Sequence, residues 1–196
     1  NGSGVGMGDF NQDGKLDVFF AGNQAASTLY LNQGDFKFED ITQSAGIQTS
    51  GRWCSGVSVV DINGDGLLDI YLSATMKLAA KDRENMLFVN QGIKDGKPSF
   101  KEMAAEYGIN DAGHSEHAAF FDYDRDGDLD VAVINHSLKK YTTGVSDNPE
   151  LRKEENPFFA SKLYRNDGGR FLDVSKIAGI TSNVLSFGLG IVVSDF

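Results

Sequence analysis

The sequence has few of the residues that cross-link or stiffen a chain. Its 196 residues include three prolines and one cysteine, Cys54. An intrachain disulfide is therefore excluded, and the cysteine content does not distinguish an oxidising from a reducing compartment. No Cys or His cluster accompanies Cys54 in the sequence, which favours a buried small side chain over a nucleophile. No apolar run approaches the roughly 20 residues that cross a bilayer, and no signal peptide is visible.

Basic residues are scarce relative to acidic ones. The chain has 18 Lys and Arg against 28 Asp and Glu, for a net charge of −10. Nucleic acid is disfavoured as a partner because a duplex needs a basic face that neutralises phosphates, and an anionic membrane is disfavoured likewise. What the sequence does have is 23 glycines, 14 phenylalanines and 40% hydrophobic residues. This composition indicates short strands joined by tight turns around a packed core.

An acidic nine-residue pattern, D-x-[DN]-x-D-G-x-x-D, dominates the organisation of the chain. Its three copies occupy residues 9–17, 61–69 and 122–130. Each copy is preceded and followed by apolar runs, and then comes a segment that resembles LYLNQG. These segments occupy residues 29–34, 87–92 and 163–168. The order of the elements never changes, which is the signature of a repeat architecture.

Each repeat accounts for about four short strands, and four antiparallel strands in a repeat of about 50–60 residues are typical of a propeller blade. We therefore predict an all-β fold of about three four-stranded antiparallel blades, a partial β-propeller that forms one domain over residues 1–196. An antiparallel sandwich is the alternative, and it is disfavoured because it does not require the same loop three times in order. The predicted repeats are residues 1–50, 51–112 and 113–183, with the start of a fourth at residues 184–196, where Asp195 and Phe196 begin another acidic pattern.

The acidic pattern has the chemistry of a site for a hard cation. Side chains at positions 1, 3, 5 and 9 can converge on one point, and position 7 offers a backbone carbonyl, so all donors are oxygens. Ca²⁺ fits best because it tolerates six or seven oxygens in irregular geometry, with Mg²⁺ and Mn²⁺ as alternatives. The glycine at position 6 permits a sharp turn. A solvated turn is the other interpretation, and three copies with the same ligand positions disfavour it.

An EF-hand would need flanking helices and a glutamate at position 12 of the loop. Position 12 is occupied by Phe20, Leu72 and Val133, and the flanks read as strands. The sequence therefore predicts EF-hand-like loops inside β-hairpins.

With these loops, the LYLNQG-like segments and the Ala-Gly-Ile elements, the whole chain resembles the FG-GAP or VCBS repeat family of integrin α-like propellers. It resembles in particular the cartilage-acidic-protein and UnbV-associated group. Phe187 and Gly188 retain the Phe-Gly signature, whereas the Gly-Ala-Pro signature is absent. In this family the acidic loop links the first two strands of a blade and binds Ca²⁺.

The resemblance implies three Ca²⁺ sites, in which the residue at position 7 contributes its carbonyl. Site one comprises Asp9, Asn11, Asp13, Lys15 and Asp17; site two comprises Asp61, Asn63, Asp65, Leu67 and Asp69; site three comprises Asp122, Asp124, Asp126, Asp128 and Asp130.

Propellers of this family usually have seven blades, and three blades cannot close a ring. Either the sequence is a fragment of a longer propeller or copies associate through open blade edges. We favour a fragment whose exposed edges could support self-association.

Five further residues are candidates for ligand binding. His114, Glu116 and His117 precede the third loop and could face a central channel or supply acid–base chemistry, although ordinary polar turn residues are the favoured interpretation. Arg52 and Trp53 occupy the same segment one repeat earlier. They could hold a carbohydrate or a carboxylate, although an aromatic side chain there more often packs between blades. No phosphate-binding loop, GxSxG or HExxH motif is present.

These features together predict a non-catalytic, calcium-stabilised propeller segment of a secreted, cell-surface or periplasmic protein. It would serve adhesion or bind a protein or glycan ligand, with calcium as a structural ion at millimolar extracellular concentration. The alternatives are a propeller-fold polysaccharide lyase or hydrolase, and a scaffold fragment of a larger protein whose function resides elsewhere.

Overall fold

Three four-stranded antiparallel sheets make up the protein. The computed structural model describes residues 4–139, 149–181 and 183–194, and within them the strands follow one another in sequence order across each sheet. This arrangement confirms the predicted all-β fold with three four-stranded sheets, which we call blades one, two and three.

The strand bounds repeat the same plan in each blade. Blade one comprises β1 (Val5–Gly8), β2 (Asp17–Phe20), β3 (Thr28–Gly34) and β4 (Lys37–Asp40). Blade two comprises β5 (Cys54–Val60), β6 (Asp69–Ala74), β7 (Met86–Lys94) and β8 (Lys97–Glu102). Blade three comprises β9 (Ser115–Phe121), β10 (Asp130–Asn135), β11 (Lys162–Asn166) and β12 (Phe171–Asp173).

Helices are short and lie in the connections between strands. A 3₁₀ turn, η1 (Ala80–Arg83), precedes β7, α1 (Ala104–Tyr107) follows β8, and α2 (Pro149–Lys153) lies between β10 and β11. Of the predicted fourth repeat, Asp195 and Phe196 lie outside the described residues. Residues 184–194 form no strand, and Phe187 makes an isolated bridge with His136 of blade three.

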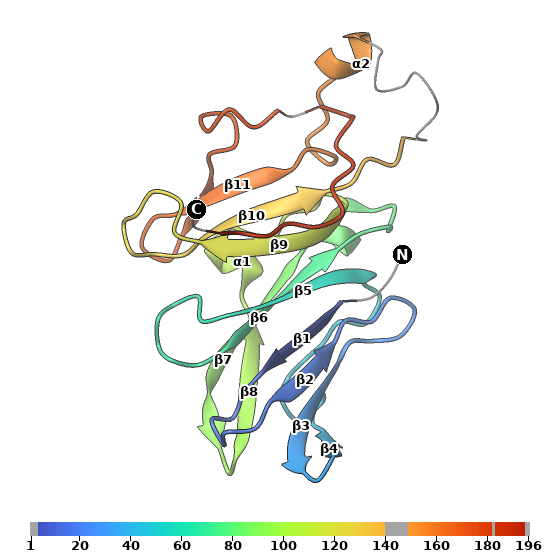
Figure 1. Cartoon of the computed structure of the whole chain (residues 1–196). Helices are drawn as coiled ribbons and strands as arrows, with labels where there is room; N and C mark the ends of the chain where they lie inside the picture. Colours follow the sequence, from blue (N-terminus) through green and yellow to red (C-terminus); the bar gives the residue numbers. More distant parts are fainter. Residues whose placement is uncertain (1–3, 140–148, 182, 195–196) are drawn as a thin grey trace.

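The blades are stacked face to face in chain order, with their first strands β1, β5 and β9 next to one another (Figure 1). The apolar cluster between blades one and two joins Phe19 and Leu31 of the first to Ile70, Leu72 and Phe88 of the second. An equivalent cluster lies between blades two and three and includes Tyr71, Val89, Val131, Val133 and Phe171.

This stacking explains the burial patterns of equivalent strands. Every residue of β6 is buried, because blade two has a neighbour on each face. In β2, by contrast, Phe19 is buried whereas Phe20 is exposed, because blade one is covered on one side. Strands with two covered faces lose the apolar–polar alternation that strands with one covered face retain.

A buried polar network also ties the connection between α1 and β9 to blade three. The Asp111 carboxylate accepts hydrogen bonds from the Tyr164 hydroxyl (2.6 Å) and the Gly113 N–H (2.7 Å), and it pairs with the Lys162 ammonium. Cys54 is fully buried and makes no disulfide, and burial raises the pKa of its thiol. The prediction of a buried, unreactive cysteine agrees with this position.

Ile70→Ala tests the packing of blade two on blade one. Ile70 is fully buried in the cluster between them, so the substitution leaves a cavity and should lower the free energy of unfolding by about 2–5 kcal/mol. Ile177→Ala is the matched control, because Ile177 is 89% exposed and its loss should cost no more than about 0.5 kcal/mol. Chemical denaturation measures both, and equal effects would contradict the stacked arrangement.

Candidate metal centres

The three acidic loops occupy the positions that the repeat predicts. Loop one (residues 9–17) joins β1 to β2, loop two (residues 61–69) joins β5 to β6, and loop three (residues 122–130) joins β9 to β10. Neighbouring loops lie close together. The Gln12 side-chain amide of loop one donates a 2.9 Å hydrogen bond to the Gly66 carbonyl of loop two, and a cleft of about 380 Å³ lies between loops two and three.

The aspartate at the first position of each loop organises the turn. In loop two, Asp61 accepts the Asp65 N–H on one carboxylate oxygen (3.1 Å) and the Gly66 N–H on the other (2.8 Å). The same pairs of hydrogen bonds join Asp9 to Asp13 and Gly14, and Asp122 to Asp126 and Gly127. Since each carboxylate oxygen has a second lone pair, these contacts orient the group and leave acceptor capacity for a cation.

The side chain at position 5 is oriented in a similar way. Asp65 accepts the N–H of Leu67 at position 7 (2.8 Å), while its own N–H donates to the Asn63 side-chain carbonyl (3.1 Å). The corresponding N–H donors to Asp13 and Asp126 are Lys15 and Asp128. Coordination through the carbonyls of Lys15, Leu67 and Asp128 stays a prediction.

The aspartate at the ninth position is the most buried group of each loop. Asp69 has no exposed surface, and its two carboxylate oxygens accept the Ile62 N–H (2.9 Å) and the Asn90 N–H (2.8 Å). Asp17 and Asp130 are equally buried. Asp17 accepts the N–H groups of Phe10 and Asn32, and Asp130 accepts those of Tyr123 and Asn166. This residue therefore ties its own loop to the third strand of the blade.

The asparagines of the LYLNQG-like segments complete this arrangement, and the ligand pattern did not include them. The Asn32 side chain donates to the carbonyl at position 8 of its loop, Leu16 (3.0 Å), and accepts the Gly34 N–H (2.9 Å). Asn90 makes the equivalent contacts with Leu68 and Gly92. Asn166 makes them with Leu129 and Gly169. The recurrence of asparagine at this point in every repeat was the signal that could have identified it.

The backbone of the loops turns sharply at two positions. The glycine at position 6 is left-handed, as predicted, with φ of 85° in Gly14 and Gly66 and 98° in Gly127. Position 4 is left-handed as well. Because Gln12 and Arg125 occupy it in loops one and three, with φ of 56° and 63°, the sequence carried no glycine signal there for these loops.

Buried and clustered carboxylates shift the pKa values of the loops. Burial, with a smaller contribution from neighbouring aspartates, raises the pKa of Asp69 to about 6 and also raises that of Asp17. The Lys15 ammonium, 2.8 Å from Asp13, instead lowers the pKa of that exposed carboxyl. Loop one thus contains a cationic partner of its own.

Loop three brings carboxylates together most closely. Ligand atoms of Asp122, Asp124 and Asp130 all lie within 4.8 Å of one another. Desolvation, followed by the charges of Asp126 and Asp130, raises the pKa of Asp124. Among described residues this is the one group of three acidic, His or Cys side chains with such geometry.

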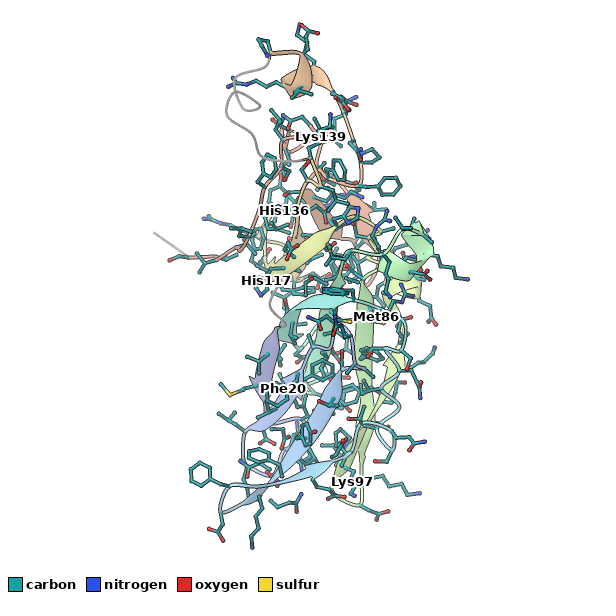
Figure 2. The ribbon with its side chains drawn as sticks, turned by 90° about the vertical axis from the view of Figure 1, so that its right-hand side faces the viewer. Phe20, Met86, Lys97, His117, His136 and Lys139 are labelled. Atoms are coloured by element: carbon teal, nitrogen blue, oxygen red, sulfur yellow. The ribbon has the colours of Figure 1, made fainter. Side chains whose placement is uncertain are left out.

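The histidine and glutamate candidates do not converge on one point. His114 is buried, with its ring against Phe159 (5.7 Å between centroids). Glu116 and His117 are consecutive on β9, so their side chains point to opposite faces of the strand. Burial raises the pKa of Glu116. His117, drawn in Figure 2 beside β9, packs against Gly56 of the neighbouring blade.

Arg52 and Trp53 line a cleft of about 360 Å³ together with Lys77. The Arg52 guanidinium already donates to the carbonyls of Lys81 and Glu84, the latter at 3.0 Å, and lies 4.0 Å from the Glu84 carboxylate. The Trp53 carbonyl accepts the Thr75 N–H (2.9 Å) at the end of β6. These contacts give Arg52 a structural role, and ligand binding by Arg52 and Trp53 stays a prediction.

Residues 9–72 match the family model described as FG-GAP-like repeat. The chain carries an FG-GAP-like repeat. The matched segment starts at the first aspartate of loop one and ends within β6, so it includes loops one and two. The predicted resemblance to this family is thereby confirmed, and its repeats imply that the four-stranded sheets are propeller blades.

Cartilage acidic protein 1 of Xenopus tropicalis is 25% identical to the chain over 158 residues, which are 80% of this chain and 23% of the relative. The Homo sapiens protein of the same name is 33% identical over 69 residues, which are 35% of this chain and 10% of the relative. The matched part of the chain thus spans less than a quarter of the length of these curated relatives. None of the helices that the structure describes is long and apolar enough to cross a membrane.

His114 should make the stability of the protein sensitive to acid. Desolvation, with contributions from Arg83 and His136, lowers the pKa of His114 to about 4, below the roughly 6.5 of an unfolded chain. Between these values the unfolded chain binds more protons, so the free energy of unfolding falls as pH decreases from about 7 to 4.

His114→Gln removes this titration and should reduce the loss between pH 7 and 4.5 by on the order of 2 kcal/mol. Denaturant unfolding at a series of pH values measures the difference between the two proteins. A difference that does not change with pH would contradict the assignment of a neutral, buried His114.

Proposed function

We propose that the three acidic loops bind Ca²⁺ and that the ion is a structural component of each blade. The observation that supports this most directly is the convergence of Asp122, Asp124 and Asp130 in loop three. The donor set fits the ion, because every predicted donor is an oxygen and Ca²⁺ is bound by carboxylates, amide oxygens and backbone carbonyls.

The energetics of the buried aspartates support the same proposal. Asp17, Asp69 and Asp130 are fully buried, and a buried carboxylate is unfavourable unless a positive charge compensates it. Their hydrogen bonds to backbone N–H groups orient them without supplying a full charge. A divalent cation beside positions 1, 3 and 5 would supply it.

Within each loop the residues have distinct roles in this proposal. The carboxylates at positions 1, 5 and 9 and the side chain at position 3 would hold the ion, and the backbone N–H donors and the asparagine of the third strand would orient them, as outer-shell groups do at metal sites. Because the ninth residue also contacts the third strand, ion binding would stabilise the whole blade.

Calcium should therefore raise the thermal stability of the chain. A site that binds the folded state alone adds about 2.7 kcal/mol when free calcium is 100 times its Kd. Differential scanning calorimetry of the calcium-free chain, with calcium added and then removed by a chelator, measures the effect. An unchanged melting temperature would contradict calcium binding by the folded protein.

Substitutions at position 5 test each loop separately. Asp13→Asn, Asp65→Asn and Asp126→Asn each remove one carboxylate charge while preserving the shape of the side chain, so each should weaken its own site at least tenfold. Asp82→Asn, in η1 and outside the loops, is the matched control. Isothermal titration calorimetry should give one fewer site for each loop variant, and full occupancy in all of them would be inconsistent with these ligands.

The three sites should differ in affinity. Loop three contains five acidic residues, whereas loops one and two contain three each, and calcium affinity increases with the charge of the ligand set. In loop one the Lys15 ammonium competes with the ion for Asp13. The same titration should therefore fill loop three first and loop one last, and the reverse order would contradict this account.

We further propose an extracellular, cell-surface or periplasmic location and a non-catalytic role in adhesion or in binding a protein or glycan. Calcium sites of extracellular modules work at about 10⁻⁴–10⁻³ M, and the relatives carry the name cartilage acidic protein. The separate positions of His114, Glu116 and His117 favour binding over a lyase or hydrolase activity. A screen of anionic and neutral glycans with a His117→Ala control tests the enzymatic alternative.

A further inference from the structure

A polar cleft of about 360 Å³ lies where blades one and two meet. It is lined by the connection between β2 and β3, the connection between β4 and β5, and the segment that follows β6. Figure 1 shows these connections at the opposite end of the strands from loops one and two. The volume falls within the roughly 300–1,000 Å³ of small-molecule sites. The polar and aromatic side chains of its lining are Asn23, Gln24, Ser50, Arg52, Trp53 and Lys77.

Backbone hydrogen bonds hold the three segments around the cleft together. The Cys54 N–H donates to the Gly22 carbonyl (3.0 Å) and thereby joins the start of β5 to the connection between β2 and β3. The Thr75 N–H donates to the Trp53 carbonyl (2.9 Å), which joins the connection before β5 to the segment after β6. The cleft is therefore framed by the fold, and a preformed site loses less conformational freedom when a ligand binds.

The backbone next to Lys77 adopts a strained turn. Met76 has a φ of 64°, in the left-handed region that residues other than glycine rarely adopt. Across Met76, the Lys77 N–H donates to the Thr75 carbonyl (2.8 Å), which makes this turn the uncommon form of the γ-turn. Strained conformations of this kind cluster at ligand-binding segments. Here the strained turn places Lys77 in the lining of the cleft.

Two cationic side chains give the cleft its charge, and the described residues that line it include no Asp or Glu. The Lys77 ammonium makes no ion pair within the described part of the chain. Arg52 uses Nη1 to donate to the carbonyls of Lys81 and Glu84, and the Glu84 carboxylate lies 4.0 Å from Nη2, beyond hydrogen-bond distance. Its Nε and Nη2 groups thus retain the forked donor pair that binds a carboxylate with two hydrogen bonds.

The uncharged side chains of the cleft suit a sugar ring. Trp53 is partly exposed, whereas its Nε1 is buried and has no hydrogen-bond partner among the described residues. The contact of Trp53 with a ligand therefore falls to its ring carbons, whose negative face attracts the C–H groups of a sugar. The amides of Asn23 and Gln24 and the Ser50 hydroxyl both donate and accept hydrogen bonds, as sugar hydroxyls require.

The length of the strands separates the cleft from the acidic loops. Strand β5 has seven residues and therefore spans about 20 Å at roughly 3.3 Å per residue. This distance exceeds the Debye length of about 8 Å at physiological ionic strength. The carboxylates of the loops consequently oppose an anion in the cleft only weakly, despite the net charge of −10.

We propose that this cleft binds an acidic carbohydrate. The carboxylate of a uronic acid would contact Lys77 and Arg52, and its sugar ring would pack on Trp53. An acidic peptide could pair with the same cations, but the ring surface, amides and hydroxyl together match a hydroxyl-rich cyclic ligand better. The proposal rests on the proposed role in glycan binding and names the site and the class of glycan.

Titration of the calcium-saturated chain with a hyaluronan tetrasaccharide, which contains glucuronic acid, tests the proposal. Trp53 is the one tryptophan of the sequence, so its fluorescence reports on this cleft, and isothermal titration calorimetry detects binding anywhere on the chain. We expect a saturable change in Trp53 emission and an affinity that falls as salt increases. The neutral tetrasaccharide of N-acetylglucosamine should bind at least tenfold more weakly, because it lacks the carboxylate.

Two variants test the cleft itself. Lys77→Gln removes one cation and should raise the dissociation constant of the acidic tetrasaccharide about tenfold. Lys94→Gln makes the same change of charge at an exposed position on β7 and should leave the affinity unchanged. Asn23→Asp adds a carboxylate to the cleft while retaining the acceptor for the Gln24 N–H, so it should prevent binding. Unchanged thermal melting of these variants would show that they are folded.

The possible failures of this test are distinguishable. Calorimetric binding of the acidic tetrasaccharide that neither cleft variant weakens would overturn this site while leaving a role in glycan binding. Equal or tighter binding of the neutral tetrasaccharide, or of a tetraglutamate peptide, would overturn the class of ligand. A chain that binds none of these probes up to about 1 mM would overturn the proposal entirely, whereas calcium binding by the loops is measured separately and would stand.

Discussion

A buried carboxylate at the end of each acidic loop is the feature on which the rest of the blade depends. Asp17, Asp69 and Asp130 have no exposed surface, and each accepts one N–H from its own loop and one from the third strand. The same residue therefore closes the hairpin and fixes the register of the next strand. Such a group is stable only where its charge is compensated, which connects the folding of the blade to the chemistry of the loop.

The second organising constraint is that each blade buries both faces only when it has two neighbours. Blade two satisfies this condition, and β6 is buried along its whole length. Blade one does not, and Phe20 and Phe38 are consequently half exposed. Since stability in repeat proteins is approximately a sum of repeat and neighbour contributions, blade two gains a neighbour contribution on each of its faces.

Much of this architecture could be predicted from the sequence because the repeat occurs three times and its copies can be compared with one another. Three copies of one acidic pattern located the first hairpin of each blade, and glycine at position 6 identified a left-handed turn. The left-handed position 4 could not be predicted in the same way, because Gln12 and Arg125 adopt a conformation that their identity does not signal. Asn90 and its counterparts were visible as a repeat but not as partners of a loop 15 to 37 residues earlier.

Residues whose role depends on packing were the least predictable. His114 could have faced a channel, yet the turn around Phe158 and Phe159 buries it. Carbonyls of the segment around η1 accept hydrogen bonds from the Arg52 guanidinium, and these contacts could not be read from the sequence. The exposure of Phe20 and Phe38 on the outer face of blade one becomes apparent only when equivalent residues of the blades are compared for burial.

Equilibrium dialysis of the full chain against radioactive calcium at neutral pH tests the central claim most directly, because it counts bound ions without relying on a change in structure. The account predicts that binding saturates at three calcium ions per chain. A chain that retains no calcium above the buffer at millimolar concentration, the range of extracellular calcium sites, would contradict it.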